Sequence, residues 1–187
     1  LSNQDWTFPT TTYYGPGRFN EIGKFCEEFE IKNPLIVTDS GSKDLPFINK
    51  LETLLSKNDI KSEVFYDISP NPRDDEISKG CDQFRSGKHD AIIAIGGGSA
   101  MDGGKSICLT VNSDTPLWDF EFEQPVPEIT KENAFPKIIT IPTTSGTGAE
   151  TEITAMVTHL EKGMKFCIWH PDVRPIFTLV DPELTLE

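Results

Sequence analysis

The spacing of hydrophobic residues predicts alternating helices and strands over the first 110 residues. Apolar side chains recur every three or four positions in three segments, which predicts helices at residues 18–29, 47–55 and 77–84. Short continuous apolar runs, typical of buried strands, occur at residues 35–38, 64–66 and 91–95. Strands that are apolar on both sides need helices on both faces of their sheet. The pattern therefore predicts the α/β class, with a mostly parallel sheet flanked by helices.

The pattern becomes less regular after residue 111. Residues 112–136 include four prolines, and we expect a long loop there with one helical turn. Further strand-like runs follow at residues 137–141, 166–169 and 176–180. A chain of 187 residues has room for one compact core, so we expect residues 1–187 to form a single domain.

Charge and hydropathy exclude several classes of partner. The formal net charge is -13, which opposes binding to the phosphate backbone of nucleic acid. No apolar run approaches the ~18 residues that a membrane span requires. The first nine residues have neither a basic start nor an apolar core, so we expect no secretory signal and a cytoplasmic location.

The cysteines and histidines are scattered along the sequence. Cys26, Cys81, Cys108 and Cys167 are far apart, and three of them fall on apolar faces, which favours buried free thiols over disulfides. The three histidines, His89, His159 and His170, show neither an i, i+4 spacing nor a shared motif, so we expect no metal site among them.

A glycine-rich turn follows the most apolar of the predicted strands. Gly96, Gly97 and Gly98 precede Ser99 and a helical stretch. Glycine lets a ligand approach the backbone closely, and a helix N-terminus offers unpaired N–H groups and a positive dipole end. The arrangement suits a pyrophosphate, although a tight strand-to-helix turn also needs glycine. It matches neither the G-x-G-x-x-G nor the Walker spacing, so a common Rossmann dehydrogenase and a P-loop NTPase both fit poorly.

A second polar segment follows the strand predicted at residues 137–141. Residues 142–152 are rich in threonine, serine and glycine. Their hydroxyl and backbone N–H groups could surround an anionic or hydroxylated ligand. A plain surface loop would have the same composition.

Together the two segments resemble the iron-containing (group III) alcohol dehydrogenase family, and the likeness extends over nearly the whole chain. It rests on residues 14–17, 37–39, 71–72, 96–99, 142–150 and 180–185, together with Asp102 and Lys105. The resemblance implies a Rossmann-like N-terminal domain, similar to that of dehydroquinate synthase, which binds a nicotinamide cofactor in a cleft facing an all-helical domain. We expect that C-terminal helical domain to be absent from this chain.

The resemblance also assigns residues to the cofactor. It places Gly97, Gly98 and Ser99 at the pyrophosphate and Asp102 towards the nicotinamide. The adenosine and ribose part of the cleft would be lined by Thr143, Thr144 and Thr147. Further along the cleft would lie Thr154, Met156 and Lys165.

Two polar residues have competing interpretations. Asp39 stands just past the first parallel strand, where the family places the group that meets the adenine ribose. A carboxylate there would accept hydrogen bonds from ribose hydroxyls and repel a 2′-phosphate, which favours NAD over NADP. It could instead cap the next helix. Asn71 lies between two prolines; the family places it near the cofactor, although it could be a turn residue only.

The function that the resemblance implies is hydride transfer between NAD and a primary alcohol or its aldehyde, assisted by Fe2+ or another divalent metal. In the family one aspartate and three histidines of the helical domain hold that metal, so the catalytic residues are unknown and we expect this chain alone to be inactive. A homo-oligomer is expected for the whole enzyme. The alternatives are a stand-alone nucleotide-binding or regulatory module, and a lyase of the dehydroquinate synthase kind that uses NAD transiently.

Overall fold

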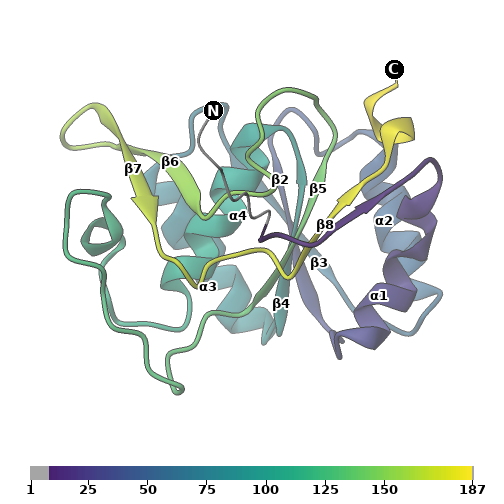
Figure 1. Ribbon diagram of the computed structural model, residues 1–187, viewed down its shortest axis with the longest axis horizontal. Coiled ribbons are helices and arrows are strands. Elements are labelled where there is room, and N and C mark those ends of the chain that lie inside the picture. Colours follow the sequence, from purple (N-terminus) through teal and green to yellow (C-terminus); the bar gives the residue numbers. More distant parts are fainter. Residues whose placement is uncertain (1–8, 187) are drawn as a thin grey trace, which may run out of the picture.

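The computed structural model describes residues 9–186 and shows a central parallel sheet covered by helices on both faces (Figure 1). The first eight residues of the N-terminal stretch considered above lie outside the described part. The strands are β1 (Thr12–Tyr14), β2 (Pro34–Asp39), β3 (Glu63–Ile68), β4 (Ala91–Gly96), β5 (Lys137–Pro142), β6 (Thr154–His159), β7 (Met164–Trp169) and β8 (Phe177–Val180). The helices are α1 (Ile22–Glu28), α2 (Pro46–Ser56), α3 (Asp74–Gly87) and α4 (Gly98–Thr110), with short 3₁₀ turns η1 (Arg18–Glu21), η2 (Leu117–Phe120) and η3 (Pro182–Thr185).

The six-stranded sheet has the order β1-β8-β5-β4-β2-β3, and every neighbouring pair is parallel. This confirms the α/β class and the helices and strands expected up to residue 110. The predicted loop with one helical turn is also present, because η2 is the one helical element between α4 and β5 in the described chain.

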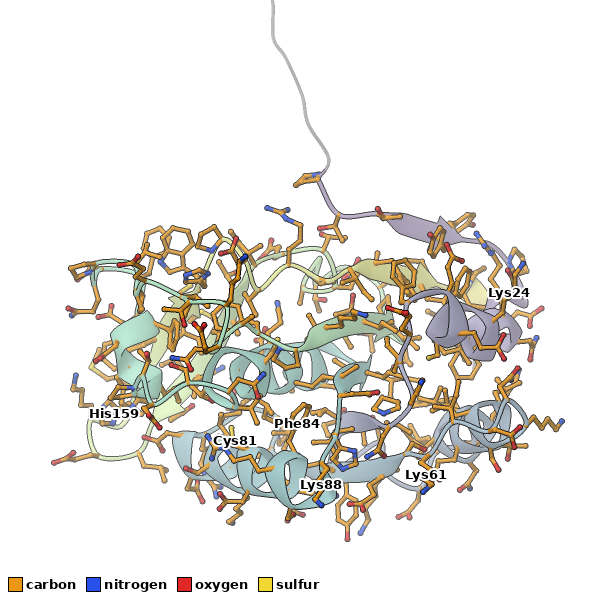
Figure 2. The ribbon with its side chains drawn as sticks, turned by 90° about the horizontal axis from the view of Figure 1, so that it is seen from below. Lys24, Lys61, Cys81, Phe84, Lys88 and His159 are labelled. Carbon is orange, nitrogen blue, oxygen red and sulfur yellow. The ribbon has the colours of Figure 1, made fainter. Side chains whose placement is uncertain are left out.

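Successive side chains of the sheet enter different cores because they alternate between its faces. On β2, Leu35 and Val37 join the cluster under α3 and α4, whereas Ile36 joins the cluster under α1 and α2. On β4, Ile92 joins the cluster under α3 and α4, and Ile93 joins the cluster under α1 and α2. Every residue of β4 is buried, which explains why its sequence is continuously apolar. Figure 2 shows Cys81 and Phe84 of α3 in the middle of the molecule, between Lys24 of α1 at one end and His159 at the other.

Two strands add to what the sequence predicted. The apolar run at residues 166–169 is a strand, β7, as predicted, and it pairs antiparallel with β6 in a hairpin separate from the main sheet. The hairpin packs against α4 on the side away from the sheet, and Ala155, Val157 and Ile168 complete the core there (Figure 1). Neither β6 nor the edge strand β1 was predicted.

The two ends of the sequence meet at β1 and β8. Asp181, just after β8, accepts hydrogen bonds from the backbone N–H of Gly17 at 3.1 Å and of Phe19 at 2.9 Å. The carboxylate thus caps the turn that enters η1. Two of the segments that carried the family resemblance, residues 14–17 and 180–185, are therefore neighbours in space.

Candidate functional site

The strand order places a topological switch point between β2 and β4. These strands are neighbours, yet the helix after β2 covers one face of the sheet and the helix after β4 covers the other. In an open parallel sheet the carboxyl ends of two such strands leave a space, and ligands of this class of fold bind there. Asp39 ends β2 and Gly96 ends β4, so the predicted ribose contact and the glycine-rich turn both begin at this point.

The Asp39 carboxylate lies close to Gly96 at this switch point. Gly96 has a φ of 141°, which an L side chain rarely adopts. A Cβ atom there would also lie 3.1 Å from Asp39 Oδ2 and 2.9 Å from the Cβ of Ala100. Glycine is therefore required both for the turn and for the approach of the carboxylate.

The Asp39 carboxylate organises its own turn. It accepts hydrogen bonds from the backbone N–H of Gly41 at 3.0 Å and from the hydroxyl of Ser42 at 2.9 Å. It does not cap the next helix, because α2 starts after Leu45. The helix-cap interpretation of Asp39 is therefore wrong, and a half-buried carboxylate remains at the end of β2.

The N-terminus of α4 faces the threonine-rich segment. Gly97 precedes the helix, and no side chain of the described residues caps its N-terminus. The first backbone N–H groups of α4 are thus left to a ligand or to water. A Cβ at Gly97 would lie 3.5 Å from the hydroxyl of Thr144, and one at Gly98 would lie 3.4 Å from the methyl of Thr147. Side chains at these glycines would fill the approach to the helix end.

A backbone hydrogen bond fixes the start of the threonine-rich segment beside β4. The N–H of Thr143 donates to the carbonyl of Gly96 at 2.9 Å. Thr140, earlier on β5, donates its hydroxyl to the carbonyl of Glu150 at 2.7 Å, which draws the far end of the segment back towards β5. The segment therefore forms a folded loop over the N-terminus of α4.

A cavity of about 320 Å³ lies between this loop, α4 and the β6–β7 hairpin. Seven of the twelve residues predicted to contact the cofactor line it: Gly98, Ser99, Asp102, Thr147, Thr154, Met156 and Lys165. A second cavity of about 480 Å³ continues from it, shares Pro70 and Lys165, and is lined by Asn71. The remaining predicted residues, Asp39, Gly97, Thr143 and Thr144, lie at or just after the carboxyl ends of β2, β4 and β5. The fold thus places these four at the carboxyl edge of the sheet and the other eight around the two cavities.

A buried lysine stabilises the wall of the first cavity. Lys105 is 0% exposed, and its ammonium group donates to the carbonyls of Ala149, at 2.9 Å, and Thr154. It also lies 3.7 Å from Asp102 Oδ1. Burial lowers the pKa of Lys105, and it raises the pKa of Asp102 because desolvation outweighs the attraction of the ammonium group.

The sequence-based site residues did not include Lys105, although the family resemblance did. Its position one helical turn after Asp102 is visible in the sequence. The two carbonyls that it binds carry no sequence signal. Glu152, which lines the cavity and accepts a 2.9 Å hydrogen bond from Thr154, was also missed.

The three histidines lie in separate places. His89 packs on Phe84 near the amino edge of the sheet, His159 stacks on Trp118 with ring centroids 4.4 Å apart, and His170 lies 3.1 Å from the carbonyl of Pro127. Among residues 9–186 there is no group of three or more His, Cys, Asp or Glu side chains that could hold a metal ion. The part of the chain described here also has no helix long and apolar enough to cross a membrane.

Curated proteins similar to this chain are dehydrogenases of small alcohols. NADH-dependent butanol dehydrogenase A of Clostridium acetobutylicum is 33% identical over 185 residues, which cover 97% of this chain and 45% of that protein. The 1,3-propanediol dehydrogenase of Citrobacter freundii is 29% identical, with 97% and 46% covered. The chain therefore spans about half the length of the curated relatives it matches.

Solved structures share the fold. A 1,3-propanediol oxidoreductase has a TM-score of 0.86 at 28% identity, over 96% of this chain and 46% of that one. Sulfoacetaldehyde reductase from Bifidobacterium kashiwanohense, in complex with NAD+, has a TM-score of 0.85 at 29% identity, over 99% and 48%. The family described as iron-containing alcohol dehydrogenase matches residues 9–182. Asp39, the glycine-rich turn and the threonine loop thus lie within that match, and the chain belongs to the iron-containing alcohol dehydrogenase family.

Proposed function

We propose that this chain binds NAD along the carboxyl edge of its parallel sheet. The observation that carries the proposal is the uncapped N-terminus of α4 at the point where the strand order reverses, with the Asp39 carboxylate on one side and the threonine loop on the other. Helix N-termini bind phosphate groups through free N–H groups and a positive dipole end. The free N–H groups and positive dipole end of α4 can bind an anion there, although the chain as a whole is acidic.

Each predicted residue has a role that follows from its place. Gly97, Gly98 and Ser99 would present backbone N–H groups to the pyrophosphate. Asp39 would accept hydrogen bonds from the ribose hydroxyls and repel a 2′-phosphate, so NAD is preferred over NADP. Thr143, Thr144 and Thr147 would contact the adenosine and ribose part of the cofactor. Towards the nicotinamide, the two cavities would use Asn71, Asp102, Thr154, Met156 and Lys165.

We further propose that the whole protein interconverts small primary alcohols and aldehydes. Bound NAD supplies the hydride acceptor, and the residues above hold and orient it. The names of the relatives, which include butanol and 1,3-propanediol dehydrogenases, support this substrate class. A homo-oligomer and a cytoplasmic location also remain proposals; free thiols at all four cysteines support a reducing compartment.

The family implies Fe2+ or another divalent metal, but the described residues do not fit one, because they offer no cluster of ligands. We expect the 187-residue chain by itself to bind dinucleotide without oxidising alcohol.

Calorimetric titration of this chain with NAD and with NADP tests the proposal. Asp39→Ala should weaken NAD binding about tenfold or more, since a hydrogen bond to a charged group is worth about 1.5–3 kcal/mol. Asp44→Ala is the matched control, because it removes the same charge from an exposed position in the same loop. Absence of NAD binding, equally tight NADP binding, or equal effects of the two substitutions would each count against the proposal.

A further inference from the structure

The loop between β3 and α3 forms one wall of the second cavity. It consists of residues 69–73 and carries Asn71 between Pro70 and Pro72. Proline has no backbone N–H, so only Ser69, Asn71 and Arg73 can donate from the main chain of this loop. Because so few N–H groups of this loop can be held, the position of Asn71 depends on the contacts that Ser69 and Arg73 make.

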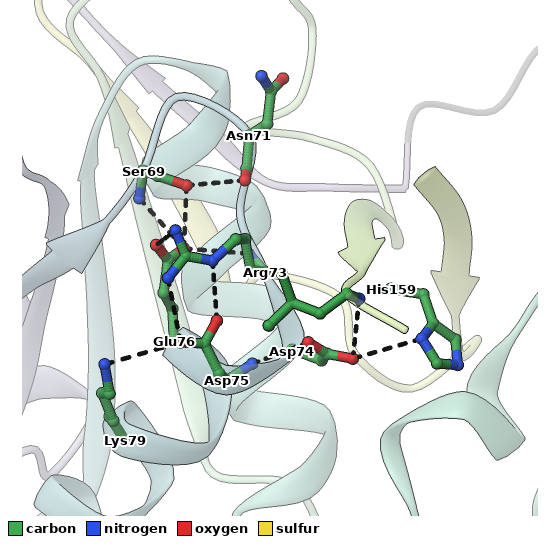
Figure 3. A network of polar contacts seen from close by, with 9 residues as sticks. Ser69, Asn71, Arg73, Asp74, Asp75, Glu76, Lys79 and His159 are labelled. Carbon is green, nitrogen blue, oxygen red and sulfur yellow. Dashed lines mark hydrogen bonds and ion pairs between the residues drawn. The ribbon is translucent and has the colours of Figure 1, made fainter. Parts of the chain in front are cut away.

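A single buried carboxylate holds two of those three N–H groups. Glu76, in the first turn of α3, is 5% exposed. Its Oε2 accepts hydrogen bonds from the N–H of Ser69 at 3.2 Å and of Arg73 at 3.0 Å. The hydroxyl of Ser69 lies 3.1 Å from the same oxygen. Figure 3 shows these contacts converging on Glu76 while the side chain of Asn71 points away from the network.

The charge of this buried carboxylate is compensated locally. Arg73 Nη1 lies 3.3 Å from Glu76 Oε1, and the N-terminus of α3 adds its positive dipole end. Hydrogen bonds to an ionised acceptor are stronger than those between neutral groups. Glu76 thus holds both ends of the loop through these hydrogen bonds.

Two further contacts hold the prolines between those ends. The hydroxyl of Ser99, at the start of α4, donates to the carbonyl of Pro70 at 2.7 Å. The N–H of Thr158 on β6 donates to the carbonyl of Pro72, also at 2.7 Å. The loop is therefore fixed from α3, α4 and the hairpin at once, and the side chain of Asn71 is left free to meet a ligand.

We propose that Glu76 is a positioning residue for the cofactor: by fixing Ser69 and Arg73, it sets where Asn71 stands at the cavity. This inference rests on the proposed function, in which Asn71 meets the nicotinamide cofactor. Glu76 itself touches no ligand and acts through the backbone of the loop. A simple helix cap would also use Glu76, but it would affect only the stability of the fold.

Asp75→Asn is a matched control for Glu76→Gln, because both substitutions remove one carboxylate that is paired with Arg73. Asp75 contacts the side chains of Arg73, at 2.9 and 3.0 Å, and of Lys79, at 3.7 Å, but it accepts no hydrogen bond from the loop N–H groups. Amide hydrogen exchange followed by NMR should show the N–H groups of Ser69 and Arg73 exchanging about tenfold faster in Glu76→Gln and at the wild-type rate in Asp75→Asn. Unchanged exchange in Glu76→Gln would overturn the inference whether or not NAD binds.

NAD titration of the same variants separates positioning from capping. Glu76→Gln should weaken NAD binding about tenfold, and Asn71→Ala should do the same, while the double variant should bind no more weakly than Asn71→Ala alone, because the two residues act through one contact. Additive losses, or NAD binding in Glu76→Gln equal to that in Asp75→Asn, would refute the role. If the wild-type chain bound no NAD, the proposed function would fail, and the exchange measurement would still decide whether Glu76 fixes the loop.

Discussion

The ammonium group of Lys105 donates a 2.9 Å hydrogen bond to the backbone carbonyl of Ala149, 44 positions further along the chain. The same group binds the carbonyl of Thr154. One side chain of α4 therefore holds the loop that follows β5 and the beginning of β6. Because the cavity lies between these elements, its shape depends on a charge that is fully buried.

Lys105→Met should destabilise the chain and loosen this loop. The substitution keeps most of the apolar stem but leaves two carbonyls without their donor and the Asp102 carboxylate without its counter-ion. Removing one partner of a buried pair typically costs about 3–5 kcal/mol, and we expect the lower end because Asp102 is partly exposed. Urea unfolding would measure the loss.

The double variant Lys105→Met, Asp102→Asn tests whether the stranded carboxylate causes part of that loss. It should be more stable than Lys105→Met alone, since no isolated charge remains. A single substitution that costs less than about 1 kcal/mol would show that the loop is held by other contacts.

Asp102 should make the unfolding free energy fall as the pH rises. Its pKa is raised above the ordinary value of 3.8 by burial, so the native chain keeps the proton to a higher pH than the unfolded chain does. The stabilisation is fully present below the unfolded pKa and is lost as the pH rises through the folded one. The stability of the wild type relative to Asp102→Asn should therefore decrease from pH 3.8 upward.

Asp75→Asn provides a control of opposite sign for this pH dependence. The hydrogen bond to Arg73 lowers the pKa of Asp75, so its contribution is present above the ordinary value and is lost as the pH falls through the folded pKa. Urea unfolding at successive pH values would measure both differences. A stability difference for Asp102→Asn that stayed constant with pH would contradict the burial of the carboxylate.

Most of the fold could be predicted because its strands and helices have strong hydrophobic periods. The strands that were missed are those whose pattern is weak or short. β1 has three residues at the edge of the sheet, with none of them fully buried. β6 alternates buried and exposed positions, but its buried residues include the small Ala155 and the polar His159, so the period is hard to distinguish from a loop. The pairing of β6 with β7 depends on distant contacts.

The residue types of the candidate site could be predicted from the sequence, but the contacts that hold its loops in place could not. Glycines and threonines after two buried strands indicate a ligand-binding edge, and the family resemblance named the residues. The capping contact of Glu76 was hidden because Arg73, not a serine or an aspartate, precedes α3. The bonds of Lys105 to two carbonyls depend on the path of a loop that local sequence does not determine.

Gly104→Ala should destabilise the chain although alanine favours helices. A Cβ at Gly104 in α4 would lie 2.6 Å from the Cβ of Ala94 in β4, and neither atom can rotate away. Overpacking of this kind typically costs about 1–3 kcal/mol, and the shift of α4 would also move Ser99 at the cavity. Adding Ala94→Gly removes the clash, so the double variant should lose less stability than the two single losses combined, as measured by thermal unfolding.

The four thiols should differ in reactivity in the native chain. Cys26, Cys81 and Cys108 are buried, and Cys167 on β7 is half-buried. Burial raises the pKa of Cys26 to about 12 and also raises the pKa of the other three thiols, so the nucleophilic thiolate is scarce in all of them. The exposure of each thiol to solvent then decides the order in which the thiols react. Iodoacetamide at neutral pH should modify Cys167 first and the buried three only after unfolding in urea, as peptide mass spectrometry would show. Native labelling of Cys26 or Cys108 at the rate of Cys167 would mean that the cores on both faces of the sheet open more readily than their packing indicates.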